Sequence, residues 1–372
     1  MIMNNRAFFW LMSAVLMVGV FVGWRVVVPL FDQGNSLTPS ALADTTPFES
    51  PRFQIDFTAS APRKQYRMYI ASGSAFVPLP DSEATICVKK SVNGPSVSGK
   101  FTGPFPNFSI ESDTLKFTTP TKAGAHAISF VSGEDTLVLN CLVPEYAPDA
   151  RKGIALGVKI GAYPNPKGGT ERMSKNIECY DAPTYFVRID STTESLPLAP
   201  SIRVGDLVAI TSKENPTRHV NFAPADYTLI FKVDLAWRKF HKSHPSIPSW
   251  RLVSWFRTPR HNRLERGGTY SRHIYGDAVD IIVDQNGDLR MDDINGDGKS
   301  NFADALEIAK VFEQMEWTGD VAFGGVGAYD YPSEQSMGAA VHTDTRGFWS
   351  RWGYSWASGV KREMIWYKEE PR

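Results

Sequence analysis

The stretch S-R-H-I-Y-G-D-A-V-D-I, residues 271–281, places a histidine, a glycine and an aspartate in and beside a β-branched run. Gly276 permits a sharp bend after His273, and a strand that follows the bend alternates its side chains between two faces. Ala278 and Asp280 then share one face. A carboxylate among Ala, Val and Ile is costly to bury without a cation or hydrogen-bond donors. The pattern therefore predicts a metal site.

A catalytic zinc ion takes about three protein ligands and keeps one position open, and histidine and aspartate are suitable donors. The third ligand is expected on a neighbouring strand, and the chain has seven histidines. His342, in A-A-V-H-T-D-T-R-G, is the best placed of these. The predicted zinc ligands are His273, Asp280 and His342. The alternative is a structural histidine turn with an aspartate that acts like a helix cap.

The composition of the whole chain sets the frame for this site. Its 372 residues are enough for two or three domains. Lys plus Arg and Asp plus Glu number 40 each, so no nucleic-acid partner is expected. The 25 prolines and ten tryptophans favour a loop-rich β or α+β chain over a helical bundle.

The N-terminal segment predicts the location of the protein. Residues 7–24 contain no charge and are long enough to cross most of a hydrocarbon core as a helix. We predict that residues 1–31 form a transmembrane anchor; the small-residue triplet at 41–43 leaves a cleaved signal peptide as the alternative. Residues 32–52 are predicted to be a linker. The chain is then a single-pass protein of the cell membrane with its bulk in the periplasm or outside the cell, or alternatively a secreted protein.

Residues 53–150 alternate strand-like runs with Gly, Pro and Asn turns, which predicts an immunoglobulin-like β-sandwich. Cys87 and Cys141 stand in two of these runs, 54 residues apart, a separation that a bridge between two sheets can span. Three free buried thiols are the alternative. Residues 151–222 hold further strand-like runs, among them G-V-K-I-G-A-Y-P, T-Y-F-V-R-I-D and G-D-L-V-A-I-T, and are predicted to be a β-rich connecting segment.

Residues 223–372 mix helix and strand signals irregularly, so we predict an α+β fold for this part. Residues 224–244 carry apolar side chains at helical spacing and end in lysines and histidines, which suit a helix C-terminus. A second helix is expected near residues 303–316.

The motif S-x-H-x-x-G-x-A-x-D, followed downstream by a histidine on a short strand, resembles that of the zinc D-alanyl-D-alanine peptidase family. The hedgehog-like α+β fold of that family also serves peptidoglycan endopeptidases. The resemblance covers about residues 225–355 and implies that residues 223–372 form a hedgehog-like zinc peptidase domain. It also implies that the trio holds Zn²⁺. The motif residues are Ser271, His273, Gly276, Ala278 and Asp280.

Two further residues take roles from this resemblance. The family places an acid or a histidine two or three residues before the last zinc ligand, where this chain has Ala340 and Ala339. Asp344 shares the strand face of His342 at roughly 7 Å, so it is predicted to act on the zinc-bound water or to orient the ligand. Arg257 resembles the family arginine that holds a substrate carboxylate or a developing oxyanion; a surface arginine beside a turn is the alternative.

The resemblance implies a zinc-dependent peptidase that remodels the cell wall. It would hydrolyse peptidoglycan stem peptides or cross-links next to D-amino acids, as a carboxypeptidase or an endopeptidase. Because Ala339 and Ala340 replace the usual acid, the alternative is a catalytically inactive zinc-fold module that binds cell-wall glycan or a protein partner.

A second metal signal lies within an insertion at residues 284–304. The run D-I-N-G-D-G-K-S-N-F-A-D has the spacing of a calcium loop and is similar to that of a dockerin or EF-hand. The preceding D-Q-N-G-D-L-R-M-D-D imitates it but has Leu289 where glycine is expected. One good loop is insufficient for a dockerin pair, so the prediction is structural Ca²⁺ and no cohesin-type partner; a solvated acidic turn is the alternative. The predicted ligands are Asp293, Asn295, Asp297, the carbonyl of Lys299, Asn301 and Asp304.

Overall fold

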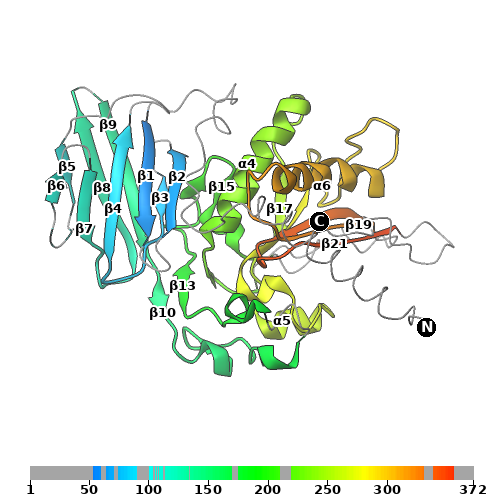
Figure 1. The fold of residues 1–372 in the computed structure, drawn as a ribbon, viewed down its shortest axis with the longest axis horizontal. Coiled ribbons are helices and arrows are strands. Elements are labelled where there is room, and N and C mark those ends of the chain that lie inside the picture. The colour runs from blue at the N-terminus through cyan, green and yellow to red at the C-terminus, as the bar shows by residue number, and fades with distance from the viewer. Residues whose placement is uncertain are drawn as a thin grey trace, which may run out of the picture. The chain divides into compact units, whose positions relative to one another are not determined.

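The N-terminal strands of the protein form two sheets (Figure 1). The computed structural model describes residues 53–59, 64–70, 74–89, 100–103, 105, 107, 109–111, 114–133, 135–169, 175–209, 219–330 and 338–355. Within these residues, one sheet has the order β2 (Lys64–Ile70), β1 (Phe53–Ala59), β4 (Glu83–Lys89), β7 (Thr114–Thr118) and β6 (Ser109–Glu111). The other has the order β3 (Ala75–Phe76), β9 (Asp135–Val143), β8 (Gly124–Ser132) and β5 (Lys100–Thr102).

Apolar side chains fill the space between these two sheets. Exposure alternates along β7 and along much of β8, as expected of strands with one face toward a core and the other toward water. Phe76 of β3 and Phe117 of β7 belong to different sheets and meet edge to face, with ring centroids 6.4 Å apart. Leu115, Ile128 and Leu139 are buried in the same core. The strand-like runs of this part therefore pack as two facing sheets; an immunoglobulin-like topology stays a prediction.

The cysteines of these sheets are not bridged. Cys87 lies in β4 and Cys141 in β9, which belong to different sheets. Cys141 is a free thiol, so the predicted bridge is absent and the free-thiol alternative holds for Cys141; Cys179 forms no disulfide bond either. Burial raises the pKa of the Cys141 thiol, which serves as a small apolar core group.

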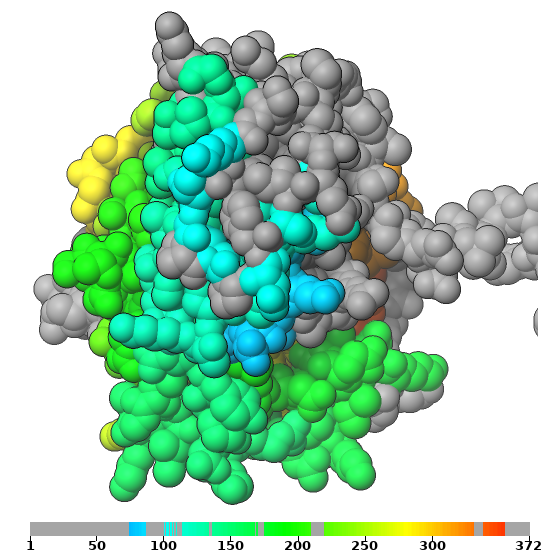
Figure 2. Space-filling view, turned by 90° about the vertical axis from the view of Figure 1, so that its left-hand side faces the viewer, coloured from blue at the N-terminus to red at the C-terminus, as the bar shows by residue number. Residues whose placement is uncertain are grey.

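The connecting segment contains short elements instead of long strands. Figure 2 shows its green residues beside the cyan and teal residues of the two sheets. Its strands pair as β10 (Glu145–Tyr146), β13 (Tyr185–Arg188) and β16 (Phe222–Ala223), as β11 (Ile154–Ala155) with β12 (Val158–Lys159), and as β14 (Pro197–Ala199) with β15 (Ile202–Arg203). Short 3-10 helices connect them: η1 (Ala150–Lys152), η2 (Pro166–Gly168), η3 (Ile177–Tyr180) and η4 (Val204–Leu207).

The run G-D-L-V-A-I-T was predicted to be strand-like, but its first residues belong to the 3-10 helix η4. The carboxylate of Asp206 accepts a hydrogen bond of 2.7 Å from the backbone N–H of Arg203. This local bond offers the backbone an alternative to strand pairing, so it overrides the β-propensity of the run. Val208 keeps one strand-like contact, a bridge to Phe256.

The C-terminal part is a mixed sheet covered by helices. Its order is β17 (Arg251–Ser254), β18 (Ala278–Ile282), β20 (Ala339–Asp344), β19 (Gly325–Asp330) and β21 (Ser350–Ser355). The long helices are α4 (Tyr227–Ser243) and α6 (Phe302–Trp317), close to their predicted spans, and the short helices are α5 (Pro259–Leu264) and η5 (Arg272–Tyr275). Helix α6 packs on β19 and β20, and α4 packs against α6 (Figure 1). Every residue of β18 and β20 is buried.

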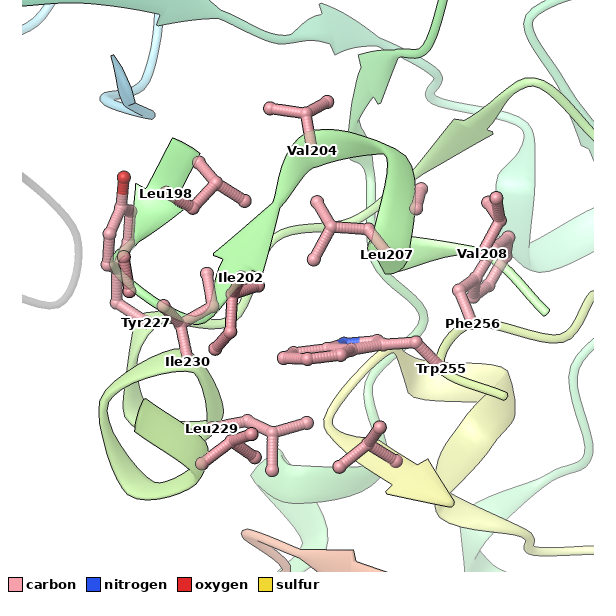
Figure 3. Packing of buried hydrophobic residues seen from close by; sticks show 14 of the residues in the cluster. Leu198, Ile202, Val204, Leu207, Val208, Tyr227, Leu229, Ile230, Trp255 and Phe256 are labelled. Carbon is pink, nitrogen blue, oxygen red and sulfur yellow. The ribbon is translucent and has the colours of Figure 1, made fainter. Parts of the chain in front are cut away.

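Trp255 connects the apolar core to the end of this sheet. Its ring is fully buried and lies between Leu207, Ile202 and the start of α4 (Figure 3). Its indole N–H donates a hydrogen bond of 2.8 Å to the carbonyl of Gly276, at the turn before β18. The core therefore fixes the place where the quoted motif turns into a strand.

The predicted anchor at residues 1–31 and the linker at 32–52 lie outside the described residues. Within the part of the chain that the structure describes, no helix combines the length and apolar character needed to cross a membrane.

Candidate metal centre

His273 is held at the site by a tight turn. It lies in η5, which ends at Gly276 with a left-handed φ of +79°. A Cβ atom at Gly276 would lie 2.2 Å from Pro224, so a larger residue would clash as well as strain the backbone. The bend that the sequence predicted after His273 is confirmed, and its glycine is required on two counts.

Asp280 and His342 are direct neighbours across β18 and β20, because the antiparallel register pairs these two residues. The imidazole Nε2 of His273 lies 3.2 Å from Oδ1 of Asp280 and 3.1 Å from Nδ1 of His342. Nδ1 of His342 lies 3.0 Å from the same oxygen of Asp280. The structure thus brings together the three residues that the sequence selected, and all three are buried.

The donor atoms of this trio have the spacing of a metal site. With zinc bonds of about 2.0–2.2 Å, two ligands of a tetrahedral ion lie ~3.3 Å apart. The three distances of 3.0–3.2 Å are close to that value. Within the described residues, this trio is the group of His, Cys, Asp or Glu side chains whose ligand atoms converge in this way. The donor set of two imidazoles and one carboxylate fits Zn²⁺.

In each imidazole, the nitrogen that points away from the trio has a hydrogen-bond partner. The other nitrogen therefore faces the candidate metal position. Nδ1 of His273 lies 2.7 Å from the carbonyl oxygen of Trp255, so this nitrogen carries the proton and Nε2 presents a lone pair. Nε2 of His342 lies 3.1 Å from Oδ2 of Asp344 and donates a hydrogen bond to it. This bond orients the ring so that Nδ1 faces His273 and Asp280. Such outer partners set the tautomer and orientation of metal-ligating histidines.

Electrostatics around the trio differ between its members. Burial and the charge of Arg257 lower the pKa of His273 to about 4, so its imidazole is neutral. Burial opposes the ionisation of Asp280 as well, but the charge of Arg257 and a hydrogen bond from His342 outweigh it and hold the Asp280 pKa well below its usual range. Burial also opposes protonation of His342, but its bonds to Asp280 and Asp344 raise its pKa. A proton on His342 therefore balances the carboxylates until a cation replaces it.

Asp344 lies on the outer side of His342. Its carboxylate is fully buried and also accepts the backbone N–H of Gly325 at 2.7 Å and three hydrogen bonds from the guanidinium of Arg346. Burial opposes its ionisation, yet Arg346 and His342 hold its pKa well below the usual range. Of the two roles that the sequence left open for Asp344, this geometry supports orientation of the ligand. A carboxylate with both oxygens occupied by donors is a weak proton acceptor.

Arg257 contacts the trio through its ligand carboxylate. Its Nη2 donates to Oδ2 of Asp280, and its Nε donates to the hydroxyl of Ser254 at 2.6 Å. Nη1 makes no hydrogen bond to the described residues, and the side chain is 18% exposed, so this nitrogen remains available to a ligand. Arg257 is therefore a residue of the site and not the isolated surface arginine of the alternative interpretation.

Trp352 forms a wall of the site that the sequence did not predict. Its ring centroid lies 5.1 Å from that of His342, and the guanidinium carbon of Arg346 lies 5.0 Å from the Trp352 ring centroid. A Cβ atom at Gly327 would lie 2.4 Å from the ring, so glycine makes the room for it. The run G-G-V-G, which places a glycine opposite the aromatic side chain of the parallel strand β21, was the available signal.

The predicted calcium loop adopts a turn built from its own side chains. Asp293 accepts the backbone N–H groups of Gly296 and Gly298 at 2.8 and 2.7 Å. Asp304 is fully buried and accepts the N–H groups of Ile294 and Asn301 at 2.8 Å each, as part of the cap that starts α6. Within the described residues, the loop acids do not converge as the trio of His273, Asp280 and His342 does. Calcium binding by this loop stays a prediction.

The chain was compared with known proteins in three ways. No family model matches it, and neither a curated protein nor a solved structure matches it.

Proposed function

We propose that the protein is an exported zinc-dependent peptidase that cleaves peptidoglycan stem peptides or cross-links next to D-amino acids. One observation carries the zinc assignment: three buried donor atoms 3.0–3.2 Å apart, with the outer nitrogen of each imidazole already bonded. The substrate class, the hedgehog-like α+β fold of residues 223–372 and the membrane anchor at residues 1–31 rest on the sequence resemblance and composition.

In this proposal His273, Asp280 and His342 hold the metal. A bound zinc ion would supply Lewis-acid chemistry for the hydrolysis of an amide near neutral pH. The protein itself fixes the positions of the three ligand side chains. Trp255 and Asp344 fix the two imidazoles, and Arg257 holds the second oxygen of Asp280, so the ligands need no rearrangement when the metal binds.

Arg257 is the proposed binding group for the substrate. Its Nη2 is fixed on Asp280, beside the metal position, while Nη1 remains available. A guanidinium in this place can donate to a peptide carboxylate or to the oxygen that gains charge in the transition state. Trp352, beside His342, offers an apolar surface for the part of the substrate next to the scissile bond.

A second candidate function has its own supporting observation. Ala339 and Ala340 are buried and carry no proton acceptor, and the carboxylate of Asp344 is engaged by Arg346 and His342. A site in which the described residues offer no unengaged acid to a water molecule suits a catalytically inactive zinc-fold module that binds cell-wall glycan or a protein partner. Binding without turnover would distinguish it.

The test uses the zinc-loaded full-length protein and purified peptidoglycan. The proposal expects shorter stem peptides, free D-alanine or monomers from cross-linked dimers, detected by chromatography and mass spectrometry. Phenanthroline, which removes zinc and leaves calcium, should abolish the products, and added zinc should restore them. His126→Ala, on β8, is the matched histidine control and should keep activity. Binding to the sacculus without any product would overturn the proposed activity in favour of the inactive module.

A further inference from the structure

The segment between β18 and α6 contains a nine-residue unit twice in succession. Residues 284–292 read D-Q-N-G-D-L-R-M-D, and residues 293–301 read D-I-N-G-D-G-K-S-N. Each unit has an oxygen-bearing side chain at its first, third, fifth and ninth positions. This spacing is that of a calcium loop. The question is therefore whether the first unit can bind calcium as the second is predicted to do.

The backbone of the first unit is folded by three hydrogen bonds. Leu289 N donates to Oδ2 of Asp284 at 3.1 Å, Asp288 N to Oδ1 of Asn286 at 2.9 Å, and Arg290 N to Oδ1 of Asp288 at 2.9 Å. The second unit makes the same three bonds at equivalent positions. They are Gly298 to Asp293 at 2.7 Å, Asp297 to Asn295 at 2.9 Å, and Lys299 to Asp297 at 2.9 Å.

Leu289 adopts the backbone conformation of the glycine that it replaces. Its φ is +61°, against +81° for Gly298 at the equivalent position of the second unit. A leucine is strained in this region, and its buried side chain, with 5% exposure, compensates by packing in the interior. The replacement of glycine that weakened the sequence match therefore leaves the shape of the first unit unchanged.

Asp284 carries the observation that points to a ligand. Its side chain is 0% exposed, and its Oδ1 is buried with no hydrogen-bond partner. Oδ2 accepts a hydrogen bond from Leu289 N, in the middle of the unit, and forms an ion pair of 2.8 Å with Arg251, so this oxygen lies against the backbone of the unit. A buried carboxylate oxygen without a donor is costly, and a cation would satisfy it.

We propose that residues 284–292 bind a second calcium ion, next to the loop at 293–304. Oδ1 of Asp284 is the buried ligand, and the side chains of Asn286, Asp288 and Asp292 with the carbonyl of Arg290 complete an oxygen-only set. Calcium is favoured over magnesium because it accepts many oxygen ligands in flexible geometry, including oxygens that already accept one hydrogen bond. Arg251 is 44% exposed, so its guanidinium has room to adjust to the cation.

The experiment measures calcium stoichiometry by equilibrium dialysis of the zinc-loaded full-length protein. Asp288→Ala and Asp297→Ala are matched variants, since each removes the fifth side chain of one unit, and Asp288 is exposed enough for its removal to leave the fold intact. The proposal expects Asp288→Ala to bind one calcium fewer than the parent protein and to keep its zinc. Asp284→Asn should cause the same loss.

Each result decides the proposal. Two calcium ions in the parent, one in either matched variant and none in the double variant support it. A single ion in the parent that is lost in Asp288→Ala and kept in Asp297→Ala also supports it. Retention of the full calcium content by Asp288→Ala and Asp284→Asn, or no bound calcium in the parent, would overturn it. Asp181→Asn, an exposed acid far along the sequence, controls for a general loss of charge.

Discussion

The strands β8 and β20 both lie inside their sheets, but their surroundings differ. Exposure alternates along much of β8, whose inward residues, such as Ile128 and Phe130, are apolar. Every residue of β20 is buried, and yet it carries His342 and Asp344. Because protein covers almost all of both faces of β20, each charge there must be paired inside the protein. Charged residues in a strand that is buried on both faces therefore indicate a site, whereas the exposed positions of β8, such as Ala125 and Ala127, only mark its solvent-facing side.

The largest expected effect tests the buried trio to which β20 contributes His342. His273→Ala should abolish stoichiometric zinc binding, because it removes one of three converging donors and leaves Asp280 with one partner fewer. Zinc content by elemental analysis after dialysis is the measurement, with His126→Ala from β8 as the control. One zinc per chain in His273→Ala would show that the trio is not the metal site.

A smaller effect is expected from the carboxylate behind His342. Asp344→Asn keeps the size of the side chain but weakens its hold on the imidazole, so zinc affinity should fall by about 10–100-fold. Zinc titration of the folded variant measures this, and Asp330→Asn on β19 is the matched control. If Asp344 only orients His342, excess zinc should restore turnover. Turnover that stays about 10²–10⁴-fold low at saturating zinc would assign it the role of a base instead.

A substitution in the apolar core between the two N-terminal sheets should affect stability and leave zinc binding unchanged. Leu139→Ala on β9 should lower the free energy of unfolding by about 2–5 kcal/mol, because it leaves a cavity in a closely packed core. Zinc affinity should not change. Urea unfolding and zinc titration of one preparation test both statements. A loss of zinc in parallel with stability would remove the distinction between the two regions.

The smallest effect concerns an ion pair at the surface. Hydrogen bonding to Arg188 lowers the pKa of Glu145, against the effect of burial, and the two side chains are 41% and 32% exposed. A lowered carboxyl pKa stabilises the fold above the unfolded-state pKa of ~4.3 and loses this contribution as the pH falls through the folded value. Glu145→Gln should therefore cost less than about 1 kcal/mol near neutral pH. The difference should vanish in acid, and a difference that grew with acidity would refute the assignment.

Local patterns predicted a large part of this structure. Helical periodicity located α4 and α6, and the motif with its downstream histidine located the trio of His273, Asp280 and His342, because these signals lie within short stretches of sequence. The partners of the site could not be predicted in this way. The carbonyl of Trp255, the hydroxyl of Ser254 and the guanidinium of Arg346 reach their places through tertiary packing, which leaves no periodic signal.

The two histidines of the trio are held by different kinds of acceptor. His273 is oriented by a main-chain carbonyl, which every amino acid at position 255 possesses, whereas His342 depends on the side chain of Asp344. A single nucleotide change converts an aspartate codon into an asparagine codon, but no codon removes a carbonyl. Genetic drift in a lineage that no longer needs the metal should therefore erode the support of His342 early, and retain that of His273 for as long as the backbone folds.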